Sequence, residues 1–343
     1  MTDDVSAVDR LLSDFLAGQE LGPGPQVSAF VRLLREFLVG GKRLRPLLCC
    51  CGWRAAGGYG DTAAVRHVAA SLELFHSFAL IHDDVMDASD TRRGRPTMHR
   101  LVAARHRGHQ AADLLGVNVA ILLGDLALGW SYDLVHAAAL DSTQAATVWP
   151  LLDAMRIETM TGQYLDLLAT GTSPGSVEDA LAIVRYKTAK YTVEYPLRLG
   201  AHLAGAGDDV LGACTAYGIP LGEAFQLRDD LLGVFGNPAE TGKPALDDLR
   251  FGKHTVLLAI ARQRADAHQR NWLDALVGDP ELDEDSAAEV RYLLTAIGAR
   301  ATVEHMITDR CNQALAILNT APFQPVAVRL LRYLTTSVTR RNR

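Results

Sequence analysis

The sequence predicts an all-α protein, built as one bundle of about 10–13 helices around a deep central cavity. Strand-like alternation is absent, while Ala/Leu-rich segments with a 3.6-residue period recur along the chain. Several segments, such as 117–128 and 151–168, are apolar on more than one face, which is typical of helices inside a large bundle. No repeat or long linker separates two cores, so we expect a single domain over residues 1–343.

Glycine and proline delimit the expected helices. Pro150 and Pro196 fall inside helical patterns and should kink or divide them, so we separate two helices near Tyr195. The main breaks lie at Gly22–Pro25, Gly57–Gly60, Thr170–Gly175 and Asn237–Pro244. The expected helices cover residues 4–18, 26–40, 43–57, 62–87, 110–138, 143–170, 177–192, 193–206, 208–234, 254–266, 284–317 and 324–338.

Composition excludes several classes of protein. The formal net charge is −6 and no basic block occurs, which argues against nucleic-acid binding. No apolar run approaches the roughly 20 residues that span a bilayer. The N-terminus, MTDDVSAVDR, has neither a basic nor an apolar region of the kind found in signal peptides. The five cysteines, three of them adjacent at Cys49–Cys51, indicate buried reduced thiols in a cytoplasmic protein.

The stretch from Leu72 to Thr97 combines acidic and basic groups. On a helix Asp83 and Asp87 share a face, and Asp84 lies about 100° round. Carboxylates held together repel one another unless a hard cation lies between them, and oxygen-only ligands favour Mg²⁺, which borrows further oxygens from a substrate phosphate. The following Arg92 and Arg93 present guanidinium groups suited to phosphate oxygens. This stretch therefore predicts a bound diphosphate.

A second aspartate pair, Asp229 and Asp230, occurs in FQLRDDLLGVFG, again after an apolar run and before a Gly/Pro loop. One such motif alone often marks only a solvated helix end, but two in one chain favour a functional interpretation. If the two helix ends pack together, they form a polar, metal-binding mouth above an apolar interior. Such a site suits an amphiphile with a diphosphate head and a hydrocarbon tail.

With both motifs in view, the sequence resembles the trans-isoprenyl diphosphate synthases (the polyprenyl synthetase family), of the short-chain type. The resemblance runs from about residue 40 to 255 and covers, in the family's order, GGKRLRP, LELFHSFALIHDDVMD, RRGRP, TGQYLDL, YKTAKYT, FQLRDD, TGKP and GKHT. It implies the isoprenoid synthase fold, a cytoplasmic homodimer, and up to three Mg²⁺ per active site, for which Mn²⁺ can substitute.

The reaction that this resemblance implies joins isopentenyl diphosphate head to tail with an allylic diphosphate of C5–C15. The allylic diphosphate ionises, the double bond of isopentenyl diphosphate attacks, and a proton is lost to the released diphosphate. Among short-chain products we favour geranylgeranyl diphosphate over farnesyl diphosphate.

The resemblance also assigns roles to residues. The metals would be held by Asp83, Asp84, Asp87, Asp229 and Asp230. The allylic diphosphate would be bound by Arg92, Lys187, Gln226, Lys243 and Lys253, of which Lys187, Gln226 and Lys253, with Thr188, are the catalytic residues. Isopentenyl diphosphate would be bound without metal by Lys42, Arg45, His76 and Arg93. Without the resemblance, Lys42 and Arg45 could be an ordinary basic helix start, and His76 a core histidine.

The second motif departs from the family at its fifth position, which is Gly233 instead of aspartate. This change removes one water-mediated contact to the metal and leaves the two leading aspartates for direct ligation. Asp247 and Asp248 follow in the next loop and could substitute in part, although we expect them to be exposed.

Product length should depend on what closes the cavity below the first motif. Phe78 and Phe75 lie five and eight residues before Asp83, and they share a helix face. Both could be ordinary core aromatics. If they face the cavity they block long chains, while Ala79 leaves room that another aromatic would remove. This pattern resembles short-chain enzymes.

Three alternatives remain open. A class I terpene cyclase shares the fold and the first motif, but it would need Ser/Thr and Glu where Gly233 and Asn237 stand. A His/Asp metallophosphohydrolase is suggested by His82-Asp83 and by scattered histidines. A non-catalytic partner subunit would not need intact aspartates and lysines.

Overall fold

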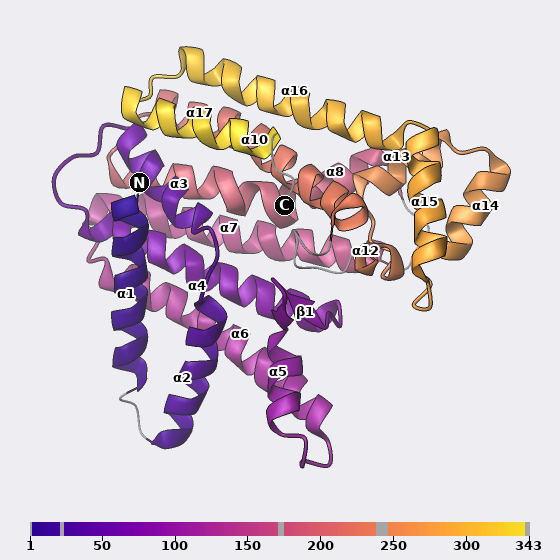
Figure 1. The fold of residues 1–343 in the computed structure, drawn as a ribbon. Helices are drawn as coiled ribbons and strands as arrows, with labels where there is room; N and C mark the ends of the chain where they lie inside the picture. Colours follow the sequence, from indigo (N-terminus) through magenta and orange to yellow (C-terminus); the bar gives the residue numbers. More distant parts are fainter. Residues whose placement is uncertain (1, 21–23, 171–174, 238–245, 340–343) are drawn as a thin grey trace. The chain divides into compact units, whose positions relative to one another are not determined.

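A computed structural model describes residues 2–20, 24–170, 175–237 and 246–339 (Figure 1). These residues are helical almost throughout. The only strands in the described ranges are β1 (Thr91–Arg92) and β2 (Arg95–Pro96), which form one antiparallel hairpin. The prediction of an all-α protein is confirmed.

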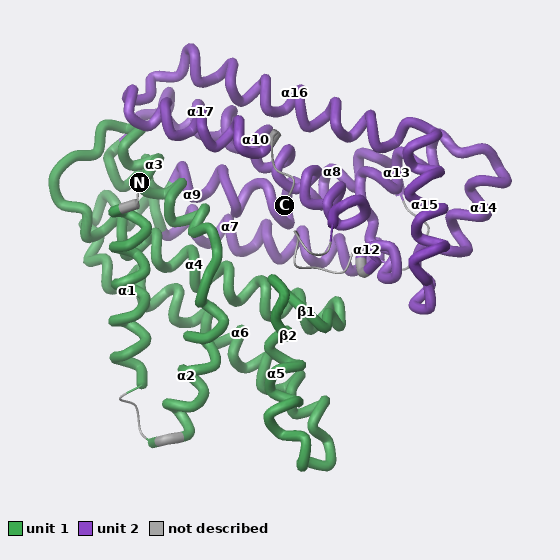
Figure 2. The backbone as a smooth tube through the Cα atoms, in the orientation of Figure 1, with its two compact units in different colours: residues 1–148, 199–205 green, residues 149–198, 206–343 purple. Residues whose placement is uncertain are grey.

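The chain divides into two compact units (Figure 2). Unit 1 comprises residues 1–148 and 199–205, and unit 2 comprises residues 149–198 and 206–343. The chain passes from unit 1 to unit 2 inside α7 (Ser142–Ala169), returns to unit 1 inside α9 (Tyr195–Leu203), and enters unit 2 again after Gly205. The single domain over residues 1–343 stays a prediction.

Unit 1 is organised around the pair α4 and α6. Its other helices pack beside them, with α1 and α3 against α4 and with α5 against α6. A Cβ at Gly124 of α6 would overlap the imidazole of His82 on α4, so the missing side chain lets the two helices touch. The His82 ring also lies 3.0 Å from the carbonyl oxygen of Ile121 and is therefore part of this packing. The helices are α1 (Thr2–Glu20), α2 (Pro25–Leu38), α3 (Leu44–Ala55), α4 (Ala63–Met86), α5 (Met98–Arg105) and α6 (Ala112–Ala137).

α6 corrects the prediction that no apolar run is long enough to span a bilayer. It has 26 residues and an 18-residue window of mean hydropathy 1.6, so by length and composition it could cross a membrane. Only 28% of that window is buried in the structure. One helix of this kind is weak evidence for a membrane span, since a helix of a packed bundle can meet the same criteria. In unit 1, α6 packs against α4 and α5.

Unit 2 is organised around α10, which packs on the π-helix η1 and on α16. Tyr217 of α10 is completely buried, and its hydroxyl donates to the carbonyl oxygen of Leu331 at 2.9 Å. The helices are α8 (Val177–Ile183), η1 (Val184–Glu194), α10 (Asp208–Phe235), α12 (Asp247–Arg250), α13 (Val256–Arg264), α14 (Ala267–Leu276), α15 (Glu284–Ala296), α16 (Ala299–Thr320) and α17 (Pro325–Thr339).

Several helix boundaries differ from the prediction. The predicted helix 284–317 is two helices, because Gly298 takes a left-handed conformation (φ 75°) that ends α15 and begins α16. Pro150 does not divide α7, whereas Pro196 lies at the start of α9, where a helix boundary was expected. The short helices α5, α12 and α14 were not predicted. Nor was the π-helical geometry of residues 184–194.

Candidate active site

The first aspartate pair lies at the C-terminal end of α4 and is bound by an arginine of the hairpin. Arg92 Nη2 lies 3.0 Å from Asp83 Oδ2 and 2.6 Å from Asp84 Oδ1, and Arg92 Nε donates to the same Asp84 oxygen at 2.7 Å. Asp84 is completely buried. Burial lowers the pKa of Arg92, but the charges of Asp84 and Asp83 outweigh this effect and raise it above its ordinary value.

The hairpin returns Arg92 to the helix end. Arg93 and Gly94, the two residues between the strands, both have positive φ values of 55° and 72°. Two consecutive residues with positive φ form the tight turn whose twist matches that of paired strands. The arginine-rich stretch after α4 is thus a short hairpin, which places Arg92 beside Asp83 and Asp84.

An arginine cluster surrounds His76, two turns before Asp83 on α4. The pKa of His76 lies well below its ordinary value, because of burial and then because of the positive charges of Arg45 and Arg93. Arg92 and Arg43 add to the same effect. The predicted residues Arg45, His76 and Arg93 are therefore brought together in unit 1. The lowered pKa keeps this imidazole neutral near pH 7.

Lys42 lies on the loop between α2 and α3, beside this cluster. The preceding Gly41 has φ 91°, and a Cβ there would lie 3.2 Å from Arg93 Nη1. Lys42 itself is exposed. The backbone on either side of Lys42 thus lies near the arginine cluster.

Arg43 and Glu73 belong to the same cluster and were not predicted. Arg43 Nη1 donates to Glu73 Oε1 at 2.7 Å, and its Nε and Nη2 donate to Asp9 Oδ1 and the Leu38 carbonyl at the same distance. Glu73 is buried, and its negative charge raises the pKa of Arg43 and partly offsets the lowering of the pKa of Arg93 by burial. A carboxylate three residues before His76 on the same helix face could have suggested this role.

The second aspartate pair lies near the end of α10 in unit 2. Gln226, one turn earlier, donates from Nε2 to Asp230 Oδ1 at 2.8 Å. Burial raises the pKa of Asp230 to about 7. The hydrogen bond from Gln226 lowers this pKa, and the negative charges of Asp248 and Asp229 raise it. Several carboxylates therefore lie close together here.

Asp248, which was expected to be exposed, lies against α10. A Cβ at Gly233 would overlap Asp248 Oδ2, so the carboxylate occupies the space beside the fifth position of the motif. Its side chain is only 25% exposed, and Lys253 Nζ lies 3.7 Å from its Oδ1. Arg250 holds α12 in place by donating twice to the carbonyl oxygen of Leu282, at 2.9 and 2.7 Å. Glycine at 233 thus admits a carboxylate from another segment.

Lys187 and Thr188 lie on η1. Lys187 Nζ donates to Asp166 Oδ2 at 2.5 Å, and Asp166 belongs to the TGQYLDL motif on α7. Asp166 is buried. The sequence motif alone assigns no role to this aspartate, and the structure shows that it pairs with the predicted catalytic lysine.

Phe75 and Phe78 share a face of α4, as their spacing predicts. Their ring centroids are 5.5 Å apart, and both side chains are buried. The Phe78 ring also meets the His82 ring edge-on at 5.0 Å. Ala79 is half-buried. A role for these residues in setting product length stays a prediction.

The predicted site residues thus fall into two groups, with the first aspartate pair and the arginine cluster in unit 1, and the second pair and Lys187 in unit 2. The convergence of the two groups stays a prediction. Lys243 lies outside the described residues. Within the described ranges, no three His, Cys, Asp or Glu side chains form a group that could hold a metal ion. The roles of the predicted site residues remain predictions.

Comparison with known proteins gives consistent results over most of the chain. Residues 28–296 match the family described as Polyprenyl synthetase. The chain is 34% identical over 318 residues to the geranylfarnesyl diphosphate synthase of Aeropyrum pernix, covering 92% of each protein. It is 34% identical over 292 residues to the geranylgeranyl diphosphate synthase of Mycobacterium tuberculosis, covering 84% of this chain and 78% of that one.

A solved structure also resembles the chain along its length. This is the crystal structure of geranylgeranyl pyrophosphate synthase from Corynebacterium glutamicum, complexed with isoprenyl diphosphate and magnesium. It has a TM-score of 0.93 and 41% sequence identity, and the match covers 98% of both chains. The family match spans most of the chain, and the two relatives each exceed 30% identity over most of their length. The chain therefore belongs to the polyprenyl synthetase family.

Proposed function

We propose that the chain is a trans-prenyltransferase that condenses isopentenyl diphosphate with an allylic diphosphate of C5–C15, and that its main product is geranylgeranyl diphosphate. The observation that carries this proposal is in unit 1. Asp83 and Asp84 form a carboxylate site at the end of α4, and two turns earlier, about 10 Å along the helix, arginines gather around His76. A metal-dependent diphosphate site and a metal-free one beside it suit a reaction between two diphosphates.

The donor set fits divalent cations of the Mg²⁺ type. Both aspartate pairs offer only oxygen ligands, and in unit 2 the buried Asp230 lies near two further carboxylates, Asp229 and Asp248. A cation there would offset repulsion that the protein otherwise contains. We propose that up to three Mg²⁺, replaceable by Mn²⁺, are held by Asp83, Asp84, Asp87, Asp229 and Asp230. When bound, the metal neutralises charge on the leaving diphosphate.

The protein's own residues then act on the allylic substrate. Arg92, Lys187 and Lys253, together with Lys243, would bind its diphosphate and stabilise the charge that grows as the carbon–oxygen bond breaks. Gln226 donates its amide hydrogen to Asp230, which leaves its amide oxygen as the group that can stabilise a positive charge. Thr188 would help to place the reacting carbon. The released diphosphate takes the proton, so no carboxylate base is required.

Isopentenyl diphosphate would be held by Lys42, Arg45, His76 and Arg93. In this pocket the arginines supply charge and the neutral imidazole supplies a hydrogen bond. Because no acidic metal ligand is required here, binding of isopentenyl diphosphate should persist when Mg²⁺ is removed.

Incubation with isopentenyl diphosphate and C5, C10 or C15 allylic primers tests the proposal. We expect prenyl diphosphates that end mainly at C20, and no product without isopentenyl diphosphate. Farnesyl diphosphate as the end product would support the alternative assignment. Hydrocarbon formed from an allylic diphosphate alone would support a terpene cyclase and overturn the proposal.

Phe78 and Phe75 are the residues proposed to close the cavity. A Phe78→Ala variant should extend the product, because it removes a ring buried against Phe75 on the helix that carries Asp83. The test is chain-length analysis of the products. A variant that makes no longer product would exclude Phe78 from this role.

We also propose that the chain acts as a homodimer in the cytoplasm. α6 exposes a row of large apolar side chains, Leu114, Ile121 and Leu122, which are 61%, 40% and 59% exposed. Apolar surface of this kind favours association with another protein surface. All five cysteines are buried thiols outside any disulfide, as expected in a reducing compartment. Light scattering should give twice the monomer mass, and Ile121→Asp should shift the protein toward monomer.

A further inference from the structure

η1 is a π-helix, which is a rare type of helix in proteins. π-helical geometry usually occurs as a single turn inside an α-helix, often at functional sites. Here it covers eleven residues, Val184–Glu194, and carries Lys187 and Thr188.

Three glycines let η1 touch its neighbours backbone to backbone. A Cβ at Gly162 of α7 would overlap the backbone nitrogen of Lys187. On the other side, Cβ atoms at Gly218 and Gly222 of α10 would lie 2.8 Å from the Cα of Glu194 and 2.6 Å from that of Ala189. The helix η1 is thus in direct contact with α7 and α10, and small displacements along α7 would move Lys187.

Two lysines of η1 form ion pairs on opposite sides of its contact with α7. Lys187 pairs with Asp166, and Lys190 Nζ lies 2.6 Å from Glu158 Oε2 and 2.8 Å from Oε1. Asp166 and Glu158 each lie four residues from Gly162, about 6 Å along α7 in opposite directions. The backbone contact at Gly162 therefore lies between two ion pairs. One of them involves the predicted catalytic residue Lys187, and the other involves Lys190.

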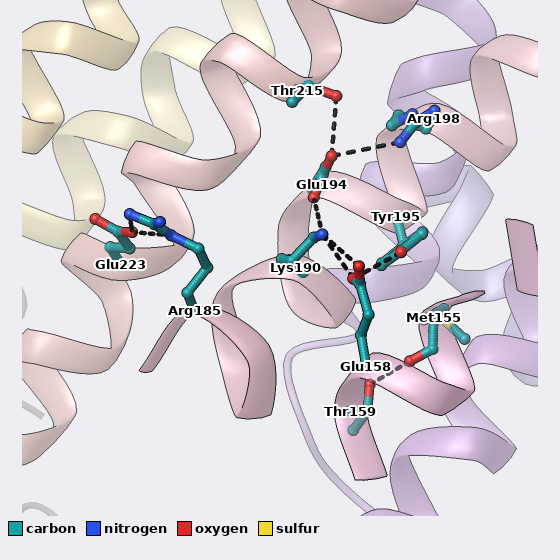
Figure 3. A network of polar contacts seen from close by, with 10 residues as sticks. All are labelled: Met155, Glu158, Thr159, Arg185, Lys190, Glu194, Tyr195, Arg198, Thr215 and Glu223. Carbon is teal, nitrogen blue, oxygen red and sulfur yellow. Dashed lines mark hydrogen bonds and ion pairs between the residues drawn. The ribbon is translucent and has the colours of Figure 1, made fainter. Parts of the chain in front are cut away.

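The second pair is part of a network (Figure 3). The hydroxyl of Tyr195 donates to Glu158 Oε2 at 2.7 Å. Lys190 Nζ lies 5.5 Å from the centroid of the Tyr195 ring, within the range of a cation–π contact. Glu194 lies 3.9 Å from the same ammonium and accepts a hydrogen bond from Thr215 of α10 at 2.9 Å. The network therefore connects η1 to α7 through Lys190 and to α10 through Glu194.

We propose that Lys190 is a positioning residue of the prenyl transfer. Held by Glu158 and Tyr195, it fixes η1 against α7 and so keeps Lys187 and Thr188 in place at the reacting allylic carbon. This inference rests on the proposed function. Lys190 touches no substrate in this role, and a displacement of about 1 Å at a reacting group can reduce the rate by ~10²-fold.

The chemistry provides a readout of misplacement. When the allylic carbon–oxygen bond breaks, its electron pair leaves with the diphosphate. The resulting cation is captured by the double bond of isopentenyl diphosphate, which then loses a proton. If the site is misaligned, water captures the cation instead and gives an allylic alcohol and a proton. The ratio of alcohol to prenyl product therefore measures positioning rather than stability.

The test compares Lys190→Leu with Arg185→Gln as a matched control. Arg185 lies on the same helix and pairs with Glu223 of α10 at 2.7 Å (Figure 3). Its side chain is 48% exposed, and Arg310 would still neutralise Glu223 from 2.7 Å. Both variants remove one positive charge from η1 and its ion pair with a glutamate, but only Lys190→Leu removes a contact with α7. Lys190→Leu also removes the 3.9 Å contact with Glu194.

We expect Lys190→Leu to lower kcat by about 10–100-fold and to raise the fraction of alcohol. The KM for isopentenyl diphosphate should stay within about two-fold, and Lys190→Arg should restore most of kcat. Arg185→Gln should change kcat by less than about three-fold. Glu158→Leu combined with Lys190→Leu should cost no more than Lys190→Leu alone, because the two residues act as one unit.

Equal kcat losses in Lys190→Leu and Arg185→Gln, or an unchanged fraction of alcohol, would overturn the proposal. If Lys190→Leu does not fold, Tyr195→Phe tests the proposal in its place, because it removes only the hydroxyl that binds Glu158. A few-fold lower kcat with more alcohol supports the proposal, and wild-type behaviour overturns it. A wild-type protein that makes no prenyl diphosphate would instead overturn the proposed function.

Discussion

The two aspartate pairs differ in how their negative charge is balanced. In unit 1, Asp83 and Asp84 share the guanidinium of Arg92 at 2.6–3.0 Å. In unit 2, the buried Asp230 accepts a hydrogen bond from the neutral amide of Gln226. The negative charges of Asp248 and Asp229 raise its pKa, and the ammonium of Lys253, which lies 3.7 Å from Asp248, lowers it.

This difference has a consequence for stability and for binding. A buried carboxylate with an arginine partner stabilises the fold as long as both partners are present. A buried carboxylate beside other carboxylates costs stability until a cation arrives. We therefore expect unit 1 to depend on its aspartates for folding and unit 2 to gain stability when they are neutralised.

Asp84→Asn should have the largest effect on stability. It leaves the mostly buried Arg92 without the carboxylate that raises its pKa most, and breaking such a pair costs about 3–5 kcal/mol. Thermal unfolding without metal should show a clearly lower Tm. Asp90→Asn is the control, because Asp90 pairs with Arg100 on the exposed surface and should cost less than about 1 kcal/mol. Equal losses in the two variants would contradict the comparison.

Gly233→Asp should come next. The new side chain would overlap Asp248 and add a like charge, with an expected loss of about 1–3 kcal/mol. Replacing Asp248 by Ala in the same protein should recover most of this loss, because it frees the space beside position 233. Gly212→Asp controls for the effect of aspartate within α10, since nothing lies within 4 Å of a Cβ there. Urea unfolding of the wild type and of these three variants measures each free energy of unfolding.

Asp230→Asn should have the opposite sign. It keeps an acceptor for Gln226 and removes a buried charge near Asp229 and Asp248, so the metal-free protein should gain roughly 1 kcal/mol. The same change should reduce prenyl transfer by about 10²-fold or more, through loss of a metal ligand. Asp309→Asn, on the exposed side of α16, should leave both unchanged. A lower Tm for Asp230→Asn would refute the difference between the two pairs.

His76→Gln should have the smallest effect. The pKa of His76 is well below 6.5, so the ring is neutral from pH 6.5 to 8 and glutamine can replace its hydrogen bond. The KM for isopentenyl diphosphate should change by no more than about three-fold, and its pH profile should run parallel to that of the wild type. Protonation would begin only as the pH falls below this range. An inflection near pH 6.5 in the wild type that the variant lacks would show that the charged ring binds substrate.

Contacts between residues close in sequence were largely predictable. Asp83, Asp84 and Arg92 lie within ten residues, so the helix geometry and the following turn place them together. The shared face of Phe75 and Phe78 follows from the helical repeat alone. The link between Arg43 and Glu73, thirty residues apart, was missed because it depends on how the loop before α3 meets α4.

Residue types and their spacing in this chain were enough to determine the helical fold class, the family and both aspartate pairs. They suffice because helix periodicity and short motifs are local properties of the backbone. The tertiary structure alone decided which charge each site residue meets: Asp166 for Lys187, Glu158 for Lys190, and Asp248 beside Gly233. Such partners are chosen by the close approach of whole elements, and at η1 that approach depends on glycines far away in the sequence.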